Sequence, residues 1–382
     1  MRTAITILVL CTALLLGLGL LMLYSAGMVK VGAAYMIKQS MWAVFGVLLA
    51  VIIYFLGIDF FRKPLVVWGI WLVAIVLLGL VLVPGIGHAA NGARRWLVLG
   101  PVMFQPSELA KIAIILLIAS YASYNQRRLQ TFVGGIVLPF ILAGVTVALI
   151  YPEPDRGCTI LCLAITLSLL FLAGIKLWQI ALTVFPLSAV FLYIILKDPV
   201  RLARILSWLD VEGTKGGAGW QVWGSLLAFG SGGLFGRGLG SSRQKLEYIP
   251  FHYTDFILPV IGEELGFICV CFVILAFLFL VLSGLYIASK ANNMFSFLVA
   301  AGCSLAIGLQ AIINIGVVSG ILPNKGLPLP FISYGGSNLL FVFACLGLIL
   351  AVASENMLAE LETPEPARCD TVVEINSTRK GN

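Results

Sequence analysis

The sequence predicts an all-α polytopic membrane protein with ten transmembrane helices. Of its 382 residues, 60% are apolar and only 11% are charged. The mean hydropathy is +1.06, above the range of soluble domains. Apolar stretches of about 20 residues, long enough to cross a bilayer as a helix, recur from end to end. The ten predicted spans are residues 4–24, 40–58, 65–83, 108–123, 134–150, 158–175, 178–196, 257–287, 295–318 and 337–354.

The first span could be mistaken for a signal peptide, but its apolar core is too long and no convincing cleavage site follows it. We interpret it as an uncleaved span. Most connections are short, and the one long loop, residues 197–256, is rich in aromatic residues, which predicts amphipathic helices packed on the membrane surface. Residues 1–355 are predicted to form one membrane domain, and the polar residues 356–382 a disordered tail.

Charge and composition argue against several functions. The net charge of +7 comes from basic residues spread thinly over loops, which argues against nucleic acid and favours lipid headgroups or pyrophosphate. The eight cysteines have no metal-ligand spacing. Only two histidines occur, His88 and His252, so a Ser/His/Asp triad and a zinc site are poorly supported. A catalytic metal would need oxygen ligands and would be magnesium or manganese. No organic cofactor is predicted.

The acidic residues indicate which face of the membrane is functional. With ten spans, both termini lie on one side. Six of the 17 acidic residues lie at or beyond Glu355, and of the other eleven only Asp59 falls on the terminal side. Carboxylates near bilayer depth are costly unless they have a partner or a function, so we place the functional face opposite the termini. Lys and Arg in the short loops are nearly balanced, so charge leaves the absolute orientation open.

Two motifs in the first half combine charge with a membrane edge. Arg94, Arg95 and Trp96 could grip a phosphate beside an apolar surface, or could anchor the chain at the interface. Further on, Ser107 is a plausible helix cap, and Glu108 stands three residues before Lys111. This pair is interpreted either as a structural intrahelical ion pair or as orienting residues of a site, and both residues are candidates for substrate binding.

Charged turns also precede two later spans. Asp155 and Arg156 lie in a tight turn at a span entrance, and pairing of Asp155 with an arginine is at least as plausible as direct catalysis. Lys245 and Asp255 lie in the segment that runs into the eighth span, with Glu263 and Glu264 following. Asp255 could cap a helix, accept a proton or hold a divalent cation.

Glycine and proline mark two further segments. Residues 229–240 are rich in glycine but lack the spacing of a dinucleotide-binding fingerprint, so phosphate binding by their backbone amides is only weakly indicated. Residues 322–337 contain three prolines and three glycines, which exclude a continuous helix. Irregular backbone at membrane depth must line a cavity or be buried in protein, so a re-entrant loop beside a substrate cavity is predicted, with Ser333, Gly335 and Gly336 as candidate site residues.

Taken in order, these motifs resemble the SEDS family (shape, elongation, division, sporulation). The resemblance covers residues 5 to 355. It rests on Gly-Ala-Arg-Arg-Trp96, Gln-Pro-Ser-Glu-Leu-Ala-Lys111, Glu-Pro-Asp-Arg-Gly157, Gln-Lys-Leu-Glu-Tyr248, Thr-Asp-Phe-Ile257, Gly-Glu-Glu-Leu-Gly266 and Lys-Gly-Leu-Pro-Leu-Pro-Phe-Ile-Ser-Tyr-Gly-Gly-Ser337.

The resemblance implies ten spans, cytoplasmic termini and a large extracytoplasmic loop. It also implies an activity, the polymerisation of lipid II, in which an acceptor sugar hydroxyl attacks the donor's anomeric carbon and undecaprenyl pyrophosphate leaves. The family's catalytic carboxylate falls on Asp255. This chain departs from the common family pattern in three places, because Phe251 replaces an acid, Tyr253 stands where histidine is usual and Arg156 replaces an apolar residue.

Several motifs are more similar to the division-associated branch of the family than to the elongation-associated branch. The implied partners are lipid II, membrane lipid, a class B penicillin-binding transpeptidase and divisome proteins. We hypothesise that Asp255 deprotonates the acceptor, with or without a bound divalent cation. Arg94, Arg95 and Lys245 would neutralise the pyrophosphate, and Trp96 would shape a lipid-facing cavity. The alternatives are a lipid II transporter, which would carry coupling charges at the midplane of broken helices, and a non-catalytic scaffold.

Overall fold

The computed structural model describes residues 1–28, 32–90, 93–100, 102–153, 155–217, 219–243 and 253–362. This part of the chain forms twelve α-helices, a small sheet, a 3-10 turn and a π-helical turn. The helices are α1 Arg2–Gly27, α2 Ala34–Arg62, α3 Pro64–Leu82, α4 Pro106–Tyr124, α5 Leu138–Ile150, α6 Arg156–Leu172, α7 Leu177–Lys197, α8 Pro199–Leu209, α9 Trp220–Gly232, α10 Ile257–Ser289, α11 Met294–Val318 and α12 Gly336–Glu362. Arg128–Gln130 is the 3-10 turn, and the π-helical turn Val133–Val137 leads into α5.

Each of the ten predicted spans overlaps a helix, although the spans 65–83 and 158–175 extend beyond α3 and α6, and the span 134–150 begins in the π-helical turn. Eight helices of the described chain are long and apolar enough to cross a membrane: α1, α2, α3, α4, α5 with its preceding turn, α10, α11 and α12. The other two stretches are shorter apolar helices, α6 and the first part of α7. A chain surrounded by lipid must satisfy its backbone hydrogen bonds internally, which is why the apolar stretches fold as helices. A count of exactly ten spans stays a prediction.

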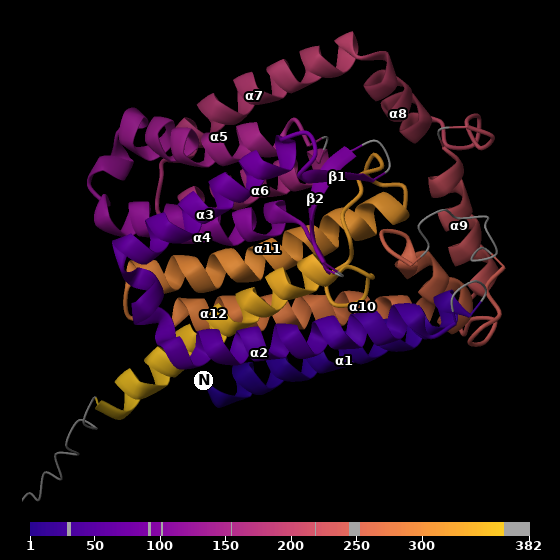
Figure 1. Ribbon diagram of the computed structural model, residues 1–382, viewed down its shortest axis with the longest axis horizontal. Coiled ribbons are helices and arrows are strands. Elements are labelled where there is room, and N and C mark those ends of the chain that lie inside the picture. The colour runs from indigo at the N-terminus through magenta and orange to yellow at the C-terminus, as the bar shows by residue number, and fades with distance from the viewer. Residues whose placement is uncertain are drawn as a thin grey trace, which may run out of the picture.

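The bundle is built around α4, α11 and α12, which are buried along most of their length. In Figure 1, α1 and α2 form the lower border, and the N-terminus lies at the same end of the bundle as the last turns of α12. Close packing of α2 on α12 depends on small residues, as is usual between membrane helices. A Cβ at Gly46 would collide with Phe343, and one at Gly347 would lie 2.9 Å from the Cα of Ala50.

The all-α class is confirmed, with one small sheet that the sequence analysis did not predict. Strands β1 Gly87–Ala90, β2 Ala93–Leu99 and β3 Val102–Phe104 form an antiparallel sheet between α3 and α4. β1 pairs with β2 through Gly87 opposite Leu97 and His88 opposite Trp96, and β2 pairs with β3 through Leu97 opposite Phe104. The strands are short and were obscured in the sequence by the glycines and charges between them.

The long loop contains α8 and α9, which are both hydrogen-bonded to the C-terminal end of α11. Trp208 on α8 donates its indole N–H to the carbonyl of Gly320 at 2.9 Å, and Ser225 on α9 donates to the carbonyl of Val318. α7 and α8 run along the upper and right borders of the molecule, and α9 packs beside the start of α10 (Figure 1). The described part of the loop therefore contains two helices, and their packing on a membrane surface stays a prediction.

The chain beyond residue 355 begins as helix, which corrects the predicted start of the disordered tail. α12 continues to Glu362. Asn356 is buried and donates its side-chain N–H to the carbonyl of Ile287 at 3.1 Å. Glu355 accepts hydrogen bonds from Arg62 at 2.6 Å and Ser296 at 2.7 Å. Residues 363–382, the rest of the predicted tail, lie outside the described residues.

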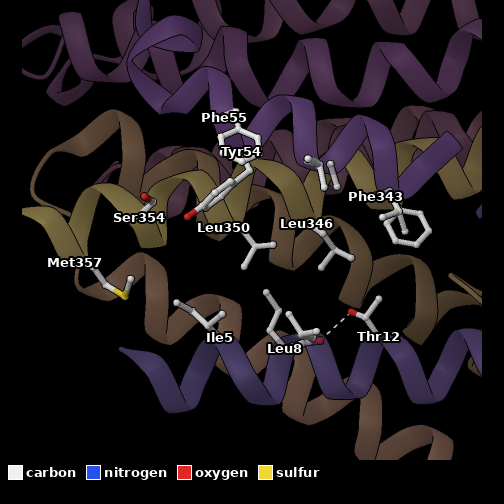
Figure 2. A pocket seen from close by; sticks show the side chains of 14 residues that line it. Ile5, Leu8, Thr12, Tyr54, Phe55, Phe343, Leu346, Leu350, Ser354 and Met357 are labelled. Carbon is white, nitrogen blue, oxygen red and sulfur yellow. Dashed lines mark hydrogen bonds between the residues drawn. The ribbon is translucent and has the colours of Figure 1, made fainter. Parts of the chain in front are cut away.

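An apolar cavity of about 590 Å³ lies between α1, α2 and α12 (Figure 2). Leu8, Phe343, Leu346 and Leu350 are among the residues that line it. Thr12 donates its hydroxyl to the carbonyl of Leu8 and therefore adds little polarity to the wall. The lining contains none of the predicted site residues, so this cavity is separate from the candidate site.

Candidate active site

Asp255 lies two residues before α10, at the end of the bundle opposite the N-terminus. The residue is partly exposed. Its Oδ2 is close to the loop after α11, because a Cβ built on Gly326 would lie 3.0 Å from it. Glycine at position 326 thus leaves room for the carboxylate.

Three groups donate hydrogen bonds to the consecutive backbone carbonyls that end at Asp255. We call the donor residues, Asn314, Ser333 and Tyr334, the carbonyl clamp. The backbone N–H of Tyr334 donates to the carbonyl of Tyr253 at 2.9 Å, and the Ser333 hydroxyl donates to the carbonyl of Thr254 at 2.6 Å. The Asn314 side chain donates to the carbonyl of Asp255 at 2.8 Å. The carboxylate is therefore held on a rigid backbone, which is the preorganisation that general-base catalysis requires.

The carbonyl clamp is supported from the helices around it. Asn314 also donates to the carbonyl of Leu327 at 2.7 Å, so one buried amide joins two loops. On α2, Gln39 is fully buried; it donates to the carbonyl of Ser333 at 3.0 Å and accepts from the backbone N–H of Gly335 at 3.2 Å. Residues 319–335 are thus irregular backbone with its polar groups satisfied by protein, consistent with the predicted re-entrant loop.

Arg95 lies at a bulge in β2. His88 pairs with Trp96 and Ala89 pairs with Arg94, so the register shifts by one residue at Arg95. Bulges redirect side chains and are frequent beside active sites. The Nε of Arg95 donates to the carbonyl of Glu153 at 2.9 Å, which holds the guanidinium at the turn before α6.

Asp155 fastens that turn to α4 and caps α6. Its Oδ1 accepts from the backbone N–H of Cys158 at 3.1 Å, and its Oδ2 accepts from the Gln105 side chain at 2.8 Å. These bonds give Asp155 a structural role, and its place among the candidate substrate-binding residues stays a prediction. Asp155 also contributes to the field at Asp255.

Asp255 and Glu153 have raised pKa values. Burial raises the pKa of Asp255 to about 7, the Asp155 carboxylate acts in the same direction, and Arg95 opposes them. Burial also raises the pKa of Glu153 to about 8, again reinforced by Asp155 and opposed by Arg95. Glu153 is fully buried, and neither of its carboxyl oxygens has a hydrogen-bond partner among the described residues. A carboxyl whose pKa lies near 7 can accept a proton from a substrate hydroxyl at neutral pH.

Glu108 and Lys111 are in the protein core, which argues against their predicted contact with substrate. They form an ion pair at 2.7 Å with side chains 7% and 0% exposed. Lys111 also donates to Gln310 at 3.0 Å and lies 3.9 Å from the ring centroid of Phe341. Gln310 in turn donates to the carbonyl of Pro328, so the pair supports the loop that carries the carbonyl clamp.

The other predicted substrate-binding residues divide into three groups. Ser333 and Gly335 make the bonds given above and therefore position the site, and Gly336 packs so closely on Trp42 that a Cβ would collide with it. Trp96 is partly exposed on β2, and Arg94 is exposed, so both can meet a ligand. Lys245 lies outside the described residues.

A family profile described as cell cycle protein, covering FtsW, RodA and SpoVE, matches residues 5–358. The chain belongs to this family. The "Probable peptidoglycan glycosyltransferase FtsW" of Coxiella burnetii is 41% identical over 363 residues, which cover 91% of this chain and 95% of that protein. The relationship extends over the whole membrane bundle, and the chain is a multi-pass membrane protein.

Solved structures agree with this family assignment. A chain of a peptidoglycan synthase complex, from a study of how polymerization and crosslinking are coordinated, matches with a TM-score of 0.79 and 29% identity, covering 91% of this chain and 97% of that one. RodA, the rod shape determining protein of Thermus thermophilus, matches with a TM-score of 0.68 and 29% identity, covering 91% and 96%.

The glycine-rich loop, residues 236–243, donates backbone hydrogen bonds to two carboxylates of the same chain. The backbone N–H groups of Gly240 and Ser242 donate to the Glu264 carboxylate at 3.0 and 3.3 Å, and that of Arg243 donates to Glu263 at 3.1 Å. Both glutamates are buried. Because two carboxylates occupy these amides, the loop is a structural anchor on α10. Of the three amides only that of Gly240 lies in the predicted segment 229–240, and phosphate binding by that segment stays a prediction.

Sequence reasoning missed the neutral amides Gln39, Gln105, Gln310 and Asn314. Two of them, Gln310 and Asn314, lie inside a predicted span and stand four residues apart on α11, where polar groups are costly without a function. That spacing is a signal that the sequence offers. No group of three His, Cys, Asp or Glu side chains that could hold a metal ion occurs within the described ranges.

Proposed function

We propose that this protein is a peptidoglycan glycosyltransferase that polymerises lipid II at the outer face of the cytoplasmic membrane, with Asp255 as the general base. The observation that carries the proposal is the setting of Asp255, a partly exposed residue whose carboxyl lies in the field of Arg95 and has its pKa raised to about 7. Three hydrogen bonds to consecutive backbone carbonyls hold its segment in place. A base with this pKa is matched to deprotonation of a sugar hydroxyl at neutral pH.

The reaction divides between Asp255 and the basic residues. Asp255 takes the proton from the acceptor hydroxyl while that oxygen bonds to the anomeric carbon of the donor. The bond from the anomeric carbon to the pyrophosphate oxygen breaks, and undecaprenyl pyrophosphate leaves with the electron pair. Arg95, Arg94 and Lys245 neutralise the charge on the leaving group, and the partly exposed Trp96 borders its lipid side.

The proposal includes a magnesium or manganese ion only as one that would bind together with the substrate. The described residues hold no group of three His, Cys, Asp or Glu ligands, and Asp255 would be the residue that holds such an ion. A bound ion would supply positive charge to the leaving group. Chelation followed by addition of magnesium or manganese, with polymer as the readout, tests this point.

Orientation and partners follow from the same proposal. The N-terminus and the last turns of α12 lie at the end of the bundle away from Asp255 (Figure 1), so cytoplasmic termini place the site outside the cell. The Coxiella burnetii relative carries the name FtsW, and a similar chain belongs to a peptidoglycan synthase complex. We therefore propose a class B penicillin-binding transpeptidase as partner, with divisome proteins at the septum.

Polymerisation of lipid II by the purified full-length protein in vesicles tests the function, with and without the transpeptidase. Asp255→Asn should lower the rate by about 10² to 10⁴, the usual range for loss of a general base. Asp59→Asn is the matched control, because Asp59 is an exposed carboxylate, paired with Arg62 at 2.8 Å, at the opposite end of the bundle. Wild-type activity of Asp255→Asn, or movement of labelled lipid II across the vesicle without polymer, would refute the proposal.

A further inference from the structure

Three tyrosines converge beside Asp255 from separate parts of the chain. Tyr35 lies in the first turn of α2, Tyr253 stands two residues before Asp255, and Tyr334 belongs to the carbonyl clamp. The rings of Tyr35 and Tyr253 stack with centroids 4.4 Å apart and planes at 16°. Tyr334 lies across them, with centroid distances of 5.1 Å to Tyr35 and 6.1 Å to Tyr253. We call these residues the tyrosine cluster.

The tyrosine cluster differs from the aromatic belt expected at a membrane edge. Belt residues are distributed around the perimeter, each with its ring among lipid headgroups. These three rings contact one another instead, and all three are only partly exposed. They therefore present a compact surface made of apolar ring faces and hydroxyl edges, which matches the alternating C–H and O–H groups of a pyranose.

The backbone fixes the tyrosine cluster relative to the base. Tyr253 and Asp255 are two residues apart, so their Cα atoms are within about 7 Å. The bond from the Tyr334 N–H to the Tyr253 carbonyl ties two of the rings to the carbonyl clamp. A sugar whose hydroxyl lies within hydrogen-bond reach of Asp255 would therefore extend its ring toward these tyrosines.

The charges around Asp255 assign the two substrates to different surfaces. Arg95, on the sheet, suits the anionic pyrophosphate of the donor. The tyrosine cluster carries no charge and comes from other elements, with α2 at the lower border of the molecule and the sheet in its upper half (Figure 1). An uncharged sugar ring fits the aromatic surface, and the acceptor is the substrate whose hydroxyl must reach the base.

We propose that Tyr35, Tyr253 and Tyr334 form the binding subsite for the acceptor saccharide, whose pyranose ring stacks on the tyrosine rings. This inference rests on the proposed function. Tyr253 stands where the resemblance predicts histidine, so this chain keeps a flat ring with a hydrogen-bonding edge at that position. A sugar stacked there would be retained while undecaprenyl pyrophosphate leaves on the other side.

The test uses two measurements on the full-length protein. Binding is measured with a soluble peptidoglycan tetrasaccharide that lacks both lipid and pyrophosphate, and polymerisation is measured with lipid II in vesicles. Tyr253→Ala should weaken tetrasaccharide binding at least tenfold and raise KM with kcat changed less than about threefold. Tyr253→Phe and Tyr253→His, which keep a ring, should lie between Tyr253→Ala and wild type.

Two controls separate sugar binding from a structural role. Tyr286→Ala removes an exposed tyrosine at the far end of α10 and should change neither measurement. Arg95→Ala should reduce polymerisation but leave tetrasaccharide binding intact, because this probe has no phosphate. Thermal unfolding in detergent identifies any variant that simply fails to fold, and Tyr253→Phe then supplies the comparison.

The outcomes distinguish this inference from the proposed function. If the wild type makes no polymer, the proposed function fails. If the wild type polymerises lipid II while Tyr253→Ala and Tyr253→Phe keep wild-type KM and tetrasaccharide affinity, the saccharide subsite is refuted and the reaction stands. A Tyr253→Ala variant that loses kcat and thermal stability, but not affinity, refutes it equally.

Discussion

Glu153 should make the protein less stable as the pH rises, and Glu153→Gln should remove that dependence. The carboxyl is fully buried, and its oxygens have no hydrogen-bond partner among the described residues. Burial raises its pKa from the ordinary 4.5 to about 8, the Asp155 carboxylate adds to the effect and Arg95 opposes it. Near pH 7 the folded protein therefore holds this proton, whereas the unfolded chain releases it.

The sign and size follow from proton linkage. Because the folded-state pKa is raised, the stability associated with this proton is fully present below about pH 4.5 and is lost as pH rises through about 8. The loss is about 1.4 kcal/mol per pH unit within that window, or about 3 kcal/mol by pH 7. Glutamine has the same shape and no titration, so the variant should gain up to about 3 kcal/mol relative to wild type at pH 7 and nothing near pH 4.

The assay is thermal unfolding in detergent between pH 5 and pH 8, followed by tryptophan fluorescence. The unfolding midpoint of the wild type should fall with pH more steeply than that of Glu153→Gln. Comparing slopes removes any constant cost of burying an amide in place of a carboxyl. Asp59→Asn, which leaves Glu153 intact, should keep the wild-type slope. Equal slopes for wild type and Glu153→Gln would refute the argument that burial keeps this carboxyl protonated.

Three further predictions use other parts of the site. Wild-type kcat/KM should rise with pH up to about 7, where Asp255 ionises. Asp155→Asn should move this rise to lower pH by up to about one unit, because it removes a charge that raises the pKa of Asp255. An unmoved profile from pH 5 to 9 would count against the coupling between the two carboxylates. Lys111→Met should destabilise the protein by about 3–5 kcal/mol by leaving Glu108 buried and unpaired, and the double variant with Glu108→Gln should recover most of the loss in thermal unfolding. Glu264→Gln should speed hydrogen exchange in the glycine-rich loop, because two backbone donors lose a charged acceptor; unchanged exchange there would contradict the anchor role.

The candidate site was only partly readable from the sequence. Asp255 and Arg95 were identified from motifs, and both lie where the structure brings a base and a cation into one field. Lys111 was assigned to substrate, yet it is buried, because the charge of a lysine does not indicate how deep its partner lies in the fold. Asn314 donates to the Asp255 carbonyl, a role that charge does not indicate because the amide is neutral.

The sequence by itself predicted the membrane helices and the end of the bundle at which the candidate site lies. In lipid, each apolar stretch must close its own backbone hydrogen bonds, so hydropathy, a local property, predicts every span without reference to its neighbours. Only the tertiary structure decided which polar groups meet. The bond from Asn314 to the Asp255 carbonyl joins residues 59 positions apart, and the bond from Ser25 to Glu264 joins residues 239 apart. Such pairings arise from how the helices pack, and no local pattern in the chain encodes them.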